Sequence, residues 1–402
     1  MPKKLWFLLI GMILNVTGNS FLWPFNTVYI HIYLGKSLSV AGLILMFNSL
    51  AGVFGNMLGG WLFDKFGGYR SILTGISITF LSILGLVINH SWTYYSCFFV
   101  ILGFGVGIVF PSMYAMVGAA WPEGGRKAFN AIYVAQNLGV AIGTALGGVV
   151  AAANINYIFT ANLLLYIVFF LVALFGFRDI GVPKVKEVKE TSHVEKAEKQ
   201  KFSFTPSMKA LMIVCCAYVL CWLVYVQWQT TIASEMQNLH IGLKKYSLLW
   251  TVNGALIVLA QPVISTAIRK YALSMRKQML FGIGFFIVST IFVSTAEQFS
   301  MFMTGMIILT IGEMFVWPAV PTIANMLAPK DRIGMYQGIV NSAATVGRML
   351  GPVIGGALVD TFNMRVLFII LVFFLLISMV FSVLYERLAK KVVKADNQTF
   401  AS

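Results

Sequence analysis

Charged residues are scarce in this chain of 402 residues, of which only 11% are Asp, Glu, Lys or Arg. Soluble globular proteins carry about 25% charged residues, so a surface with so few charges does not face water. Hydrophobic residues instead make up 59% of the chain. This composition excludes a disordered chain, a collagen and a soluble enzyme, and it indicates a protein that lies in lipid.

Residues that bind metals or act as nucleophiles are also few. The four cysteines lie inside apolar runs without zinc-ligand or redox spacing, and no two of the four histidines share a helix face. The chain has no G-x-x-x-x-G-K loop that would hold the phosphates of ATP. We therefore expect no metal site, no cofactor and no enzymatic activity.

Long apolar runs are abundant, and each is long enough to cross the hydrocarbon core, which takes about 20 residues. The runs are continuously apolar rather than alternating, so they predict helices and not the strands of a membrane barrel. The expected fold is an all-α polytopic membrane protein with twelve transmembrane helices. The predicted spans are about 5–31, 38–63, 71–89, 93–120, 128–153, 156–177, 210–234, 247–268, 278–296, 299–327, 333–359 and 366–385.

The distribution of Lys and Arg predicts the orientation. Loops on the side of the two termini hold 24 of the 29 basic residues, and the opposite side holds four. By the positive-inside rule both termini are cytoplasmic, and the expected location is the plasma (inner) membrane. The net charge of +15 is therefore a topology signal and does not indicate a nucleic-acid partner. The partners we expect are the lipid bilayer, protons and a small-molecule substrate, for a monomeric protein.

The chain divides into two related halves. Shifting the sequence by 207 residues places Gly105 on Gly312, and the pair Pro111 and Pro122 on Pro318 and Pro329. This repeat predicts two pseudo-symmetric six-helix bundles with a substrate site between them near mid-membrane. The predicted divisions are an N-terminal bundle over 1–177, a cytoplasmic linker rich in Lys and Glu over 178–208, a C-terminal bundle over 209–385 and a cytoplasmic tail over 386–402.

A series of glycines also recurs, with a shift of 208 residues. Glycines one helical turn apart let two helix backbones approach closely and slide, so the recurrence favours a functional helix interface in both halves. The alternative interpretation is ordinary tight helix packing, which gives the same spacing. The glycines are Gly139, Gly143, Gly147 and Gly148, which recur as Gly347, Gly351, Gly355 and Gly356.

The loop after the second predicted span carries a known signature. Its residues Gly60, Asp64, Lys65, Gly67 and Arg70 match the pattern G-x-x-x-D-[RK]-x-G with a following base, so the chain resembles the major facilitator superfamily. The resemblance implies that Asp64 caps a neighbouring helix, pairs with a base and locks one access state. The counterpart after the eighth span, Arg269-Lys270-Tyr271, lacks the acid.

The eleventh span resembles the antiporter motif of that family's drug–proton exchangers, G-x-x-x-G-P-x-x-G-G. Here it reads Gly347-Arg348-Met349-Leu350-Gly351-Pro352-Val353-Ile354-Gly355-Gly356. In those exchangers the motif belongs to the fifth helix, where this chain has Thr144 in place of the proline. Ala135-Gln136-Asn137-Leu138 also looks like the multidrug exporters, but Ile132 stands where some of them carry a carboxylate.

Only Glu313 and Arg348 are clearly ionisable within the twelve spans. A charge at mid-bilayer costs at least ~2.5–3.5 kcal/mol, so each is a candidate functional residue. Both lie about 20 Å from the cytoplasmic ends of consecutive antiparallel helices, so we expect them to meet. The pair is either a proton-coupling site or a static ion pair that fixes packing. The junction Gly312-Glu313 resembles a proton-coupling site of exporters and favours the first.

Polar and aromatic residues near the expected substrate site form the final group of candidates. The predicted substrate-cavity residues are Asn19, Trp23, Gln136, Asn137, Trp222, Tyr225, Gln229 and Trp317. Aromatic residues near span ends also serve as interface anchors.

The function that these features predict is a proton-coupled exporter of hydrophobic or cationic small molecules that works by alternating access. Two alternatives stay open at this point. One is a proton-coupled transporter of a single polar metabolite, such as a sugar or amino-acid derivative. The other is a non-transporting sensor or lipid scramblase.

Overall fold

The computed structural model describes residues 2–22, 25–26, 29–178, 180, 205–271 and 273–399, and every regular element in these ranges is helical. Twelve helices in the described part are long and apolar enough to cross a membrane, which confirms the predicted all-α polytopic fold. The protein is therefore a multi-pass membrane protein.

The elements fall into two sets of six spans. The N-terminal half contains α1 (Lys3–Leu22), η1 (Tyr29–Tyr33), α3 (Leu38–Phe66), α4 (Gly68–Ile88), α5 (Trp92–Ala120), η2 (Pro122–Gly124), α6 (Arg126–Ala153) and α7 (Tyr157–Gly176). The C-terminal half contains α8 (Pro206–Tyr225), η3 (Val226–Gln229), α9 (Thr231–Asn238), α10 (Leu243–Lys270), α11 (Met275–Val293), α12 (Phe299–Leu327), α13 (Ile333–Thr361) and α14 (Met364–Thr399).

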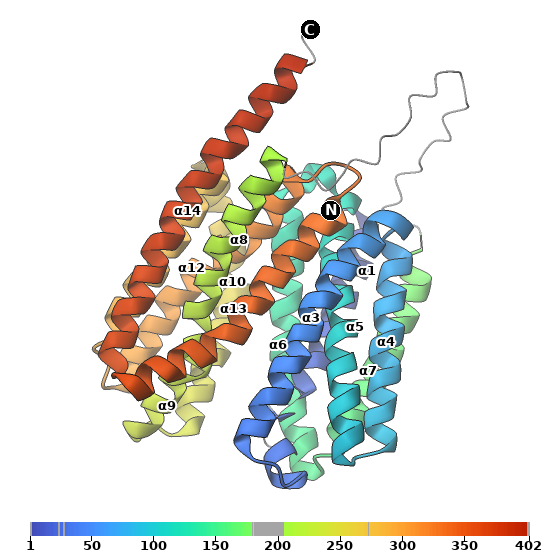
Figure 1. Cartoon of the computed structure of the whole chain (residues 1–402), viewed down its shortest axis with the longest axis vertical. Helices are drawn as coiled ribbons and strands as arrows, with labels where there is room; N and C mark the ends of the chain where they lie inside the picture. Colours follow the sequence, from blue (N-terminus) through green and yellow to red (C-terminus); the bar gives the residue numbers. More distant parts are fainter. Residues whose placement is uncertain are drawn as a thin grey trace.

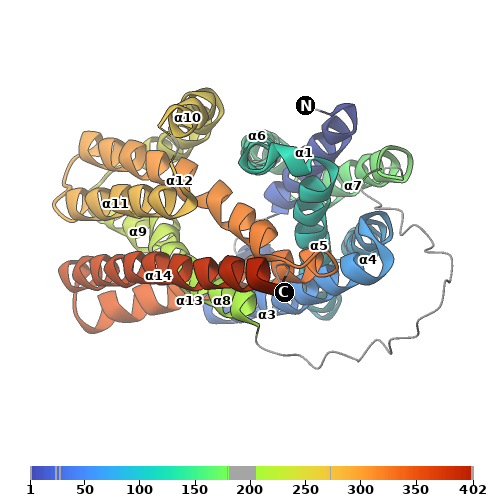
Figure 2. The ribbon, with the colours of Figure 1, turned by 90° about the horizontal axis from the view of Figure 1, so that it is seen from above.

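The two halves lie side by side as separate groups of helices when the molecule is seen from above (Figure 2). Both chain ends lie at the same end of the molecule, which is the upper end in Figure 1 and is called the terminal side below. The helices α3 and α13 lie close together toward this side and diverge toward the opposite side (Figure 1). The halves therefore meet more closely at the terminal side than at the other.

The first span of each half is interrupted, which the predicted continuous spans 5–31 and 210–234 did not anticipate. In the N-terminal half α1 ends at Leu22, and a π-helical turn, η1, follows at Tyr29. Pro24 stands two residues after Leu22 and has no backbone N–H for a helical hydrogen bond. In the C-terminal half α8 ends at Tyr225, and the 3₁₀ turn η3 leads into the short helix α9. The break places Tyr225 at a helix end inside the molecule.

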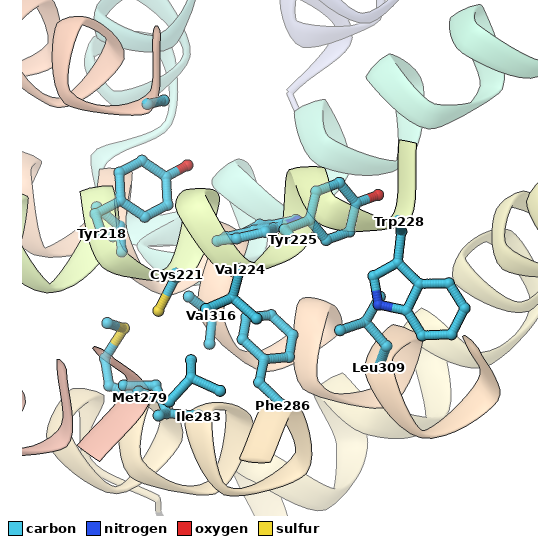
Figure 3. Close-up of a cluster of buried hydrophobic side chains, with 14 of the residues drawn as sticks. Tyr218, Cys221, Val224, Tyr225, Trp228, Met279, Ile283, Phe286, Leu309 and Val316 are labelled. Atoms are coloured by element: carbon cyan, nitrogen blue, oxygen red, sulfur yellow. The ribbon is translucent and has the colours of Figure 1, made fainter. Parts of the chain in front are cut away.

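Each half has its own apolar core. In the C-terminal half, Cys221 and Val224 of α8 meet Met279, Ile283 and Phe286 of α11 (Figure 3). In the same view the rings of Tyr218 and Tyr225, which belong to the same buried cluster, lie on the other side of α8. One face of α8 therefore packs on α11, and the tyrosine face packs on Trp317 of α12.

The boundaries of the predicted linker and tail differ slightly from the helix ends. Helix α8 begins at Pro206, and the Thr205 hydroxyl caps it by accepting from the Met208 N–H at 3.2 Å. Residues 181–204 of the predicted linker 178–208 lie outside the described residues. Helix α14 continues to Thr399, so most of the predicted tail 386–402 prolongs the last span as a helix.

Candidate functional site

Asp64, at the end of α3, binds the start of α13 in the other half. Its two carboxylate oxygens accept hydrogen bonds from the backbone N–H groups of Gly334 at 2.6 Å and Met335 at 2.8 Å. The first N–H groups of a helix have no partner within it, and a carboxylate there is also stabilised by the helix dipole. Asp64 therefore caps α13 and ties the two halves together at the terminal side.

The signature glycines are explained by close backbone contact and by a turn. A Cβ atom on Gly60 would collide with the carbonyl oxygen of Gly334, and one on Gly334 would collide with that of Gly60. Gly67 has a φ of 82°, in the left-handed region that favours glycine, and it separates α3 from α4. The signature thus allows two backbones to touch and lets the chain reverse beside Asp64.

The basic residues of the signature do not pair with Asp64. Lys65 places its ammonium group over the ring of Trp61, 4.7 Å from the centroid, and Arg70 is exposed. Within the described ranges no salt bridge of 4.0 Å or less joins Asp64 to a base. The implied acid–base pair is therefore absent in this state, where the carboxylate oxygens accept from the Gly334 and Met335 backbone instead.

A polar face of α6 makes further ties between the halves. Arg126 donates to the Met314 carbonyl oxygen at 3.0 Å, and Asn130 donates to the Ser265 hydroxyl at 2.7 Å. The Met314 oxygen lacks its usual helical donor because Pro318, four residues later, has no N–H. Arg126 therefore satisfies a carbonyl group that the proline leaves free, beside Glu313.

The recurrent glycines pack within each half rather than between the halves. Cβ atoms on Gly139 and Gly143 would meet the α1 backbone at the oxygens of Ile13 and Thr17, at 2.8 and 2.5 Å. In the C-terminal half the motif faces α8, where a Cβ on Gly347 would lie 2.9 Å from the Val219 oxygen. The interface that the repeat predicts is thus the contact of α6 and α13 with the interrupted first helix of their own half.

The remaining motif members follow the same division. Gly351 and Gly355 face Val226 and Gln227, and Gly147 faces Phe21, while Gly148 and Gly356 have open space around them. Pro352 lies inside α13, one turn after Arg348. The Gln227 side chain donates to the Gly351 carbonyl oxygen at 2.8 Å, so the glycine row also admits a hydrogen bond that holds the end of α8.

Glu313 lies at the middle of α12, and only 1% of its surface is exposed. One carboxylate oxygen accepts from the Asn253 amide of α10 at 2.7 Å, and the other accepts from the Tyr133 hydroxyl of α6 at 3.5 Å. Asn253 also donates to the Thr310 hydroxyl at 2.8 Å, which fixes the orientation of its amide. The carboxylate therefore receives donors from both halves of the molecule, with Tyr133 from the N-terminal half and Asn253 from the C-terminal half.

Arg348 lies at the middle of α13 but does not meet Glu313. Its guanidinium donates to the Thr345 hydroxyl at 3.2 Å and lies over the Trp222 ring, 4.7 Å from the centroid. In the described part of the chain no salt bridge involves either Arg348 or Glu313. The expectation of an ion pair is wrong, because equal depth does not fix the direction in which two helices point their side chains.

Aromatic rings lie between these two charged groups. Trp222 and Trp317 are stacked with centroids 4.7 Å apart and planes at 5°, and the Tyr225 ring meets both edge-on at 5.3 and 5.5 Å. Tyr218 contacts Trp317 at 5.4 Å. Tyr225 and Trp317 also face the Glu313 carboxylate. We call Tyr218, Trp222, Tyr225 and Trp317 the aromatic cluster; three of its four members are predicted cavity residues.

The other predicted cavity residues lie apart from the cluster or are tied to their own helices. Gln136 accepts from the Tyr114 hydroxyl at 2.9 Å, while Asn137 and Asn19 donate to carbonyl oxygens one turn earlier in their helices. Gln229 ends the turn η3. Trp23 lies outside the described residues.

Two functional contacts were missed by sequence reasoning, although a signal for one of them was present. Arg126, Asn130, Tyr133 and Asn137 are spaced by 4, 3 and 4 residues, which places them on one face of α6. The first three of them contact the C-terminal half. The role of Asn253 had no comparable signal, since a single Asn in an apolar span is common packing.

Comparisons with known proteins agree with this architecture. The family model described as Major Facilitator Superfamily matches residues 8–275 and 229–401. The chain is 54% identical over 402 residues, covering 100% of both chains, to a Bacillus subtilis protein named uncharacterized MFS-type transporter YttB. It is 24% identical to the quinolone resistance protein NorA of Staphylococcus aureus, covering 90% of this chain and 91% of that protein. The crystal structure of the human organic anion transporter MFSD10 has the same fold, with a TM-score of 0.76 and 15% identity over 95% of this chain and 100% of that chain.

Proposed function

This chain belongs to the Major Facilitator Superfamily and is a membrane transporter rather than an enzyme; from this premise we propose that it is a proton-coupled exporter of hydrophobic small molecules. The observation that carries the proposal is the position of Glu313. It is an enclosed carboxylate at the middle of a span, and it is held by donors from both halves, among them Tyr133 and Asn253.

The proton would act through these two hydrogen bonds. A charged carboxylate accepts strongly from both Tyr133 and Asn253, whereas a protonated one accepts more weakly. Gain of a proton therefore loosens the tie between the halves, and loss of the proton restores it. Coupling of proton movement to alternating access requires a group whose protonation shifts the equilibrium between two arrangements of the halves. Glu313 would be that group.

The state described here would be open away from the cytoplasm. The halves are joined near the terminal side by Asp64 with Gly334 and Met335, by Asn130 with Ser265, and by the close contact of Gly60 with Gly334. With both termini cytoplasmic, as the basic loops indicate, these contacts close the cytoplasmic side. Export would then proceed by opening this side, binding the compound, and closing again.

The aromatic cluster supports a hydrophobic substrate. Trp222 is half-buried and rests on the buried rings of Tyr225 and Trp317, which together form an apolar wall next to a small number of polar groups, as in sites for aromatic compounds. A transporter of one polar metabolite needs several hydrogen-bonding side chains converging on the centre, and the cluster presents mainly rings. The similarity to a protein named quinolone resistance protein is a further reason to favour export of a hydrophobic compound over transport of one polar metabolite.

The test uses everted membrane vesicles from cells that make the protein, with the neutral lipophilic dye Nile red added outside, at the face that is cytoplasmic in the cell. We expect respiration to drive dye removal from this side into the lumen, and a proton uncoupler to abolish it. Vesicles without the protein are the control. Dye removal that persists with the uncoupler would exclude proton coupling, and no removal in any condition would favour the transporter of one polar metabolite.

A further inference from the structure

Arg348 carries a charge for which the described residues provide no acidic partner within 4.0 Å. It lies at the middle of α13, and its side chain remains exposed. A guanidinium has five N–H donors, and the one hydrogen bond found here goes to the Thr345 hydroxyl. Most of its donors are therefore available to another group.

The neighbours of Arg348 place its side chain between the halves. Trp222 of α8 lies under the guanidinium, and the Thr345 hydroxyl that accepts from Arg348 also accepts from the Asn56 amide of α3 at 3.2 Å. Asn56 belongs to the N-terminal half, whereas the other two belong to the C-terminal half. A side chain facing lipid would have no neighbour from the opposite half, so the exposed guanidinium faces the region where a substrate binds in this fold.

Packing alone does not account for an arginine at this position. The repeat shift of 208 residues places Val140 of α6 at the position equivalent to Arg348, so the duplicated helix folds with an aliphatic side chain there. The acid at the same depth, Glu313, is held by Asn253 and Tyr133 and leaves the guanidinium unpaired. Charges are retained at mid-membrane depth where they bind a substrate, an ion or a proton.

We propose that Arg348 and the aromatic cluster bind an amphipathic organic anion, with its carboxylate or sulfonate on the guanidinium and its aromatic body against the exposed part of Trp222. The planar guanidinium donates two parallel hydrogen bonds to a carboxylate, and the half-buried Trp222, held in place by its stack on the buried Trp317, provides apolar surface next to it. This inference rests on the proposed transport function, since it names the class of substrate. It replaces the cationic compounds that the sequence also allowed, because Arg348 repels a cation at this place.

The test compares three ligands that share a naphthalene body and differ in charge: 2-naphthoate, 2-naphthamide and (2-naphthylmethyl)trimethylammonium. Binding to the purified full-length protein is measured by isothermal titration calorimetry in detergent, without a pH gradient. We expect naphthoate to bind about tenfold or more tightly than the amide and the cation, because only the anion gains charge-assisted hydrogen bonds. Equal binding of naphthoate and naphthamide, tighter binding of the cation, or no binding of naphthoate would overturn the proposal.

Variants assign the preference to one residue. Arg348→Gln should weaken naphthoate binding about tenfold while changing naphthamide binding by about twofold or less. Arg348→Lys, which keeps the charge, should retain a preference for the anion, and Arg365→Gln removes an exposed arginine elsewhere as the matched control. A preference unchanged in Arg348→Gln would overturn the assignment. If that variant does not fold, the wild-type ranking and Arg348→Lys decide.

The result is separable from that of the proposed function. Binding without a gradient does not depend on proton coupling, so an anion site can be confirmed even where the uncoupler leaves dye export unchanged. Conversely, uncoupler-sensitive export with no preference for naphthoate would remove the anion site and leave the exporter.

Discussion

The two halves of the molecule share the prolines and glycines that shape their backbone, and they differ in the positions of their charged residues. The prolines and glycines of α5 and α6 recur in α12 and α13, and both halves begin with an interrupted span. The charged residues do not recur: Glu313 corresponds to Val106, Arg348 to Val140, and Asp64 to Tyr271.

This asymmetry indicates that the repeated residues and the unrepeated charged residues have different roles. The repeated residues set how closely helices approach, which both halves need for the same packing. The N-terminal half contributes Asp64, whose hydrogen bonds to α13 join the halves at the terminal side. The C-terminal half contributes the buried acid Glu313 and the unpaired Arg348 at the centre. The four predictions below test these roles, in order of the size of the effect.

The largest effect is expected from removing the acid that the C-terminal half alone carries. Glu313→Gln keeps the shape but cannot exchange a proton; Asn253 can still donate to its oxygen, and the Tyr133 hydroxyl can turn to accept from its NH₂ group. Uncoupler-sensitive export should fall to the level of vesicles without the protein, while downhill exchange of substrate persists. The measurement is dye export beside counterflow in the same vesicles. Glu297→Gln, at an exposed position before α12, is the control, and full export by Glu313→Gln would make Glu313 structural.

The second prediction breaks the close contact between α3 and α13. Gly334→Ala adds a methyl group that collides with the Gly60 carbonyl oxygen. Overpacking costs about 1–3 kcal/mol, so the closed terminal side should lose about tenfold to hundredfold in relative population.

Spin labels at Glu123 and Lys277, introduced after the native cysteines are replaced, report this separation by pulsed electron–electron resonance. The control is Gly254→Ala, where an added Cβ meets nothing within 4 Å. An unchanged distance distribution in Gly334→Ala would show that this contact does not hold the halves together.

The third prediction weakens the cap without adding bulk. Asp64→Asn should leave the protein folded, but it replaces one accepting oxygen by an NH₂ group that faces a backbone donor. Loss of a charge-assisted bond costs about 1.5–2 kcal/mol, so we expect transport to slow about tenfold to thirtyfold. Initial rates in proteoliposomes provide the measurement, with Asp360→Asn as an exposed control. Wild-type rates in Asp64→Asn would remove the gating role of the signature.

The smallest effect is expected at the equivalent contact of α6 with α10, which has no acid. Asn130→Ala removes a single neutral hydrogen bond to Ser265. Such a bond contributes about 0.5–1.5 kcal/mol, so transport should change by about twofold to tenfold. The same rate assay applies, and a loss larger than that of Asp64→Asn would reverse the proposed ranking of the two contacts.

Much of the fold could be predicted from the sequence because hydrophobic length and repetition are local properties. The twelve spans follow from apolar runs, and Asp64 follows from a short motif at a helix end. The interruption after Leu22 was missed because the apolar run continues through it, although Pro24 already removes a backbone donor there.

The contacts of the site were harder to predict because they depend on how each helix is rotated about its axis. Glu313 and Arg348 lie at equal depth, yet α12 directs Glu313 toward α10 and α6, and α13 directs Arg348 toward Trp222 of α8. Sequence spacing gives depth at 1.5 Å per residue but gives no rotation relative to a distant helix. The polar face of α6 could be predicted from the sequence, since all its residues lie on one helix and their spacing shows that they share a face.

The most direct test of the central claim, that Glu313 carries the coupled proton, is to measure proton movement itself. Proteoliposomes containing a trapped pH-sensitive dye are given an outward gradient of a compound that wild-type vesicles export, with no initial pH difference. We predict that wild-type protein moves protons against the flow of the compound, and that Glu313→Gln moves the compound without protons. Equal proton movement by both proteins would contradict the account.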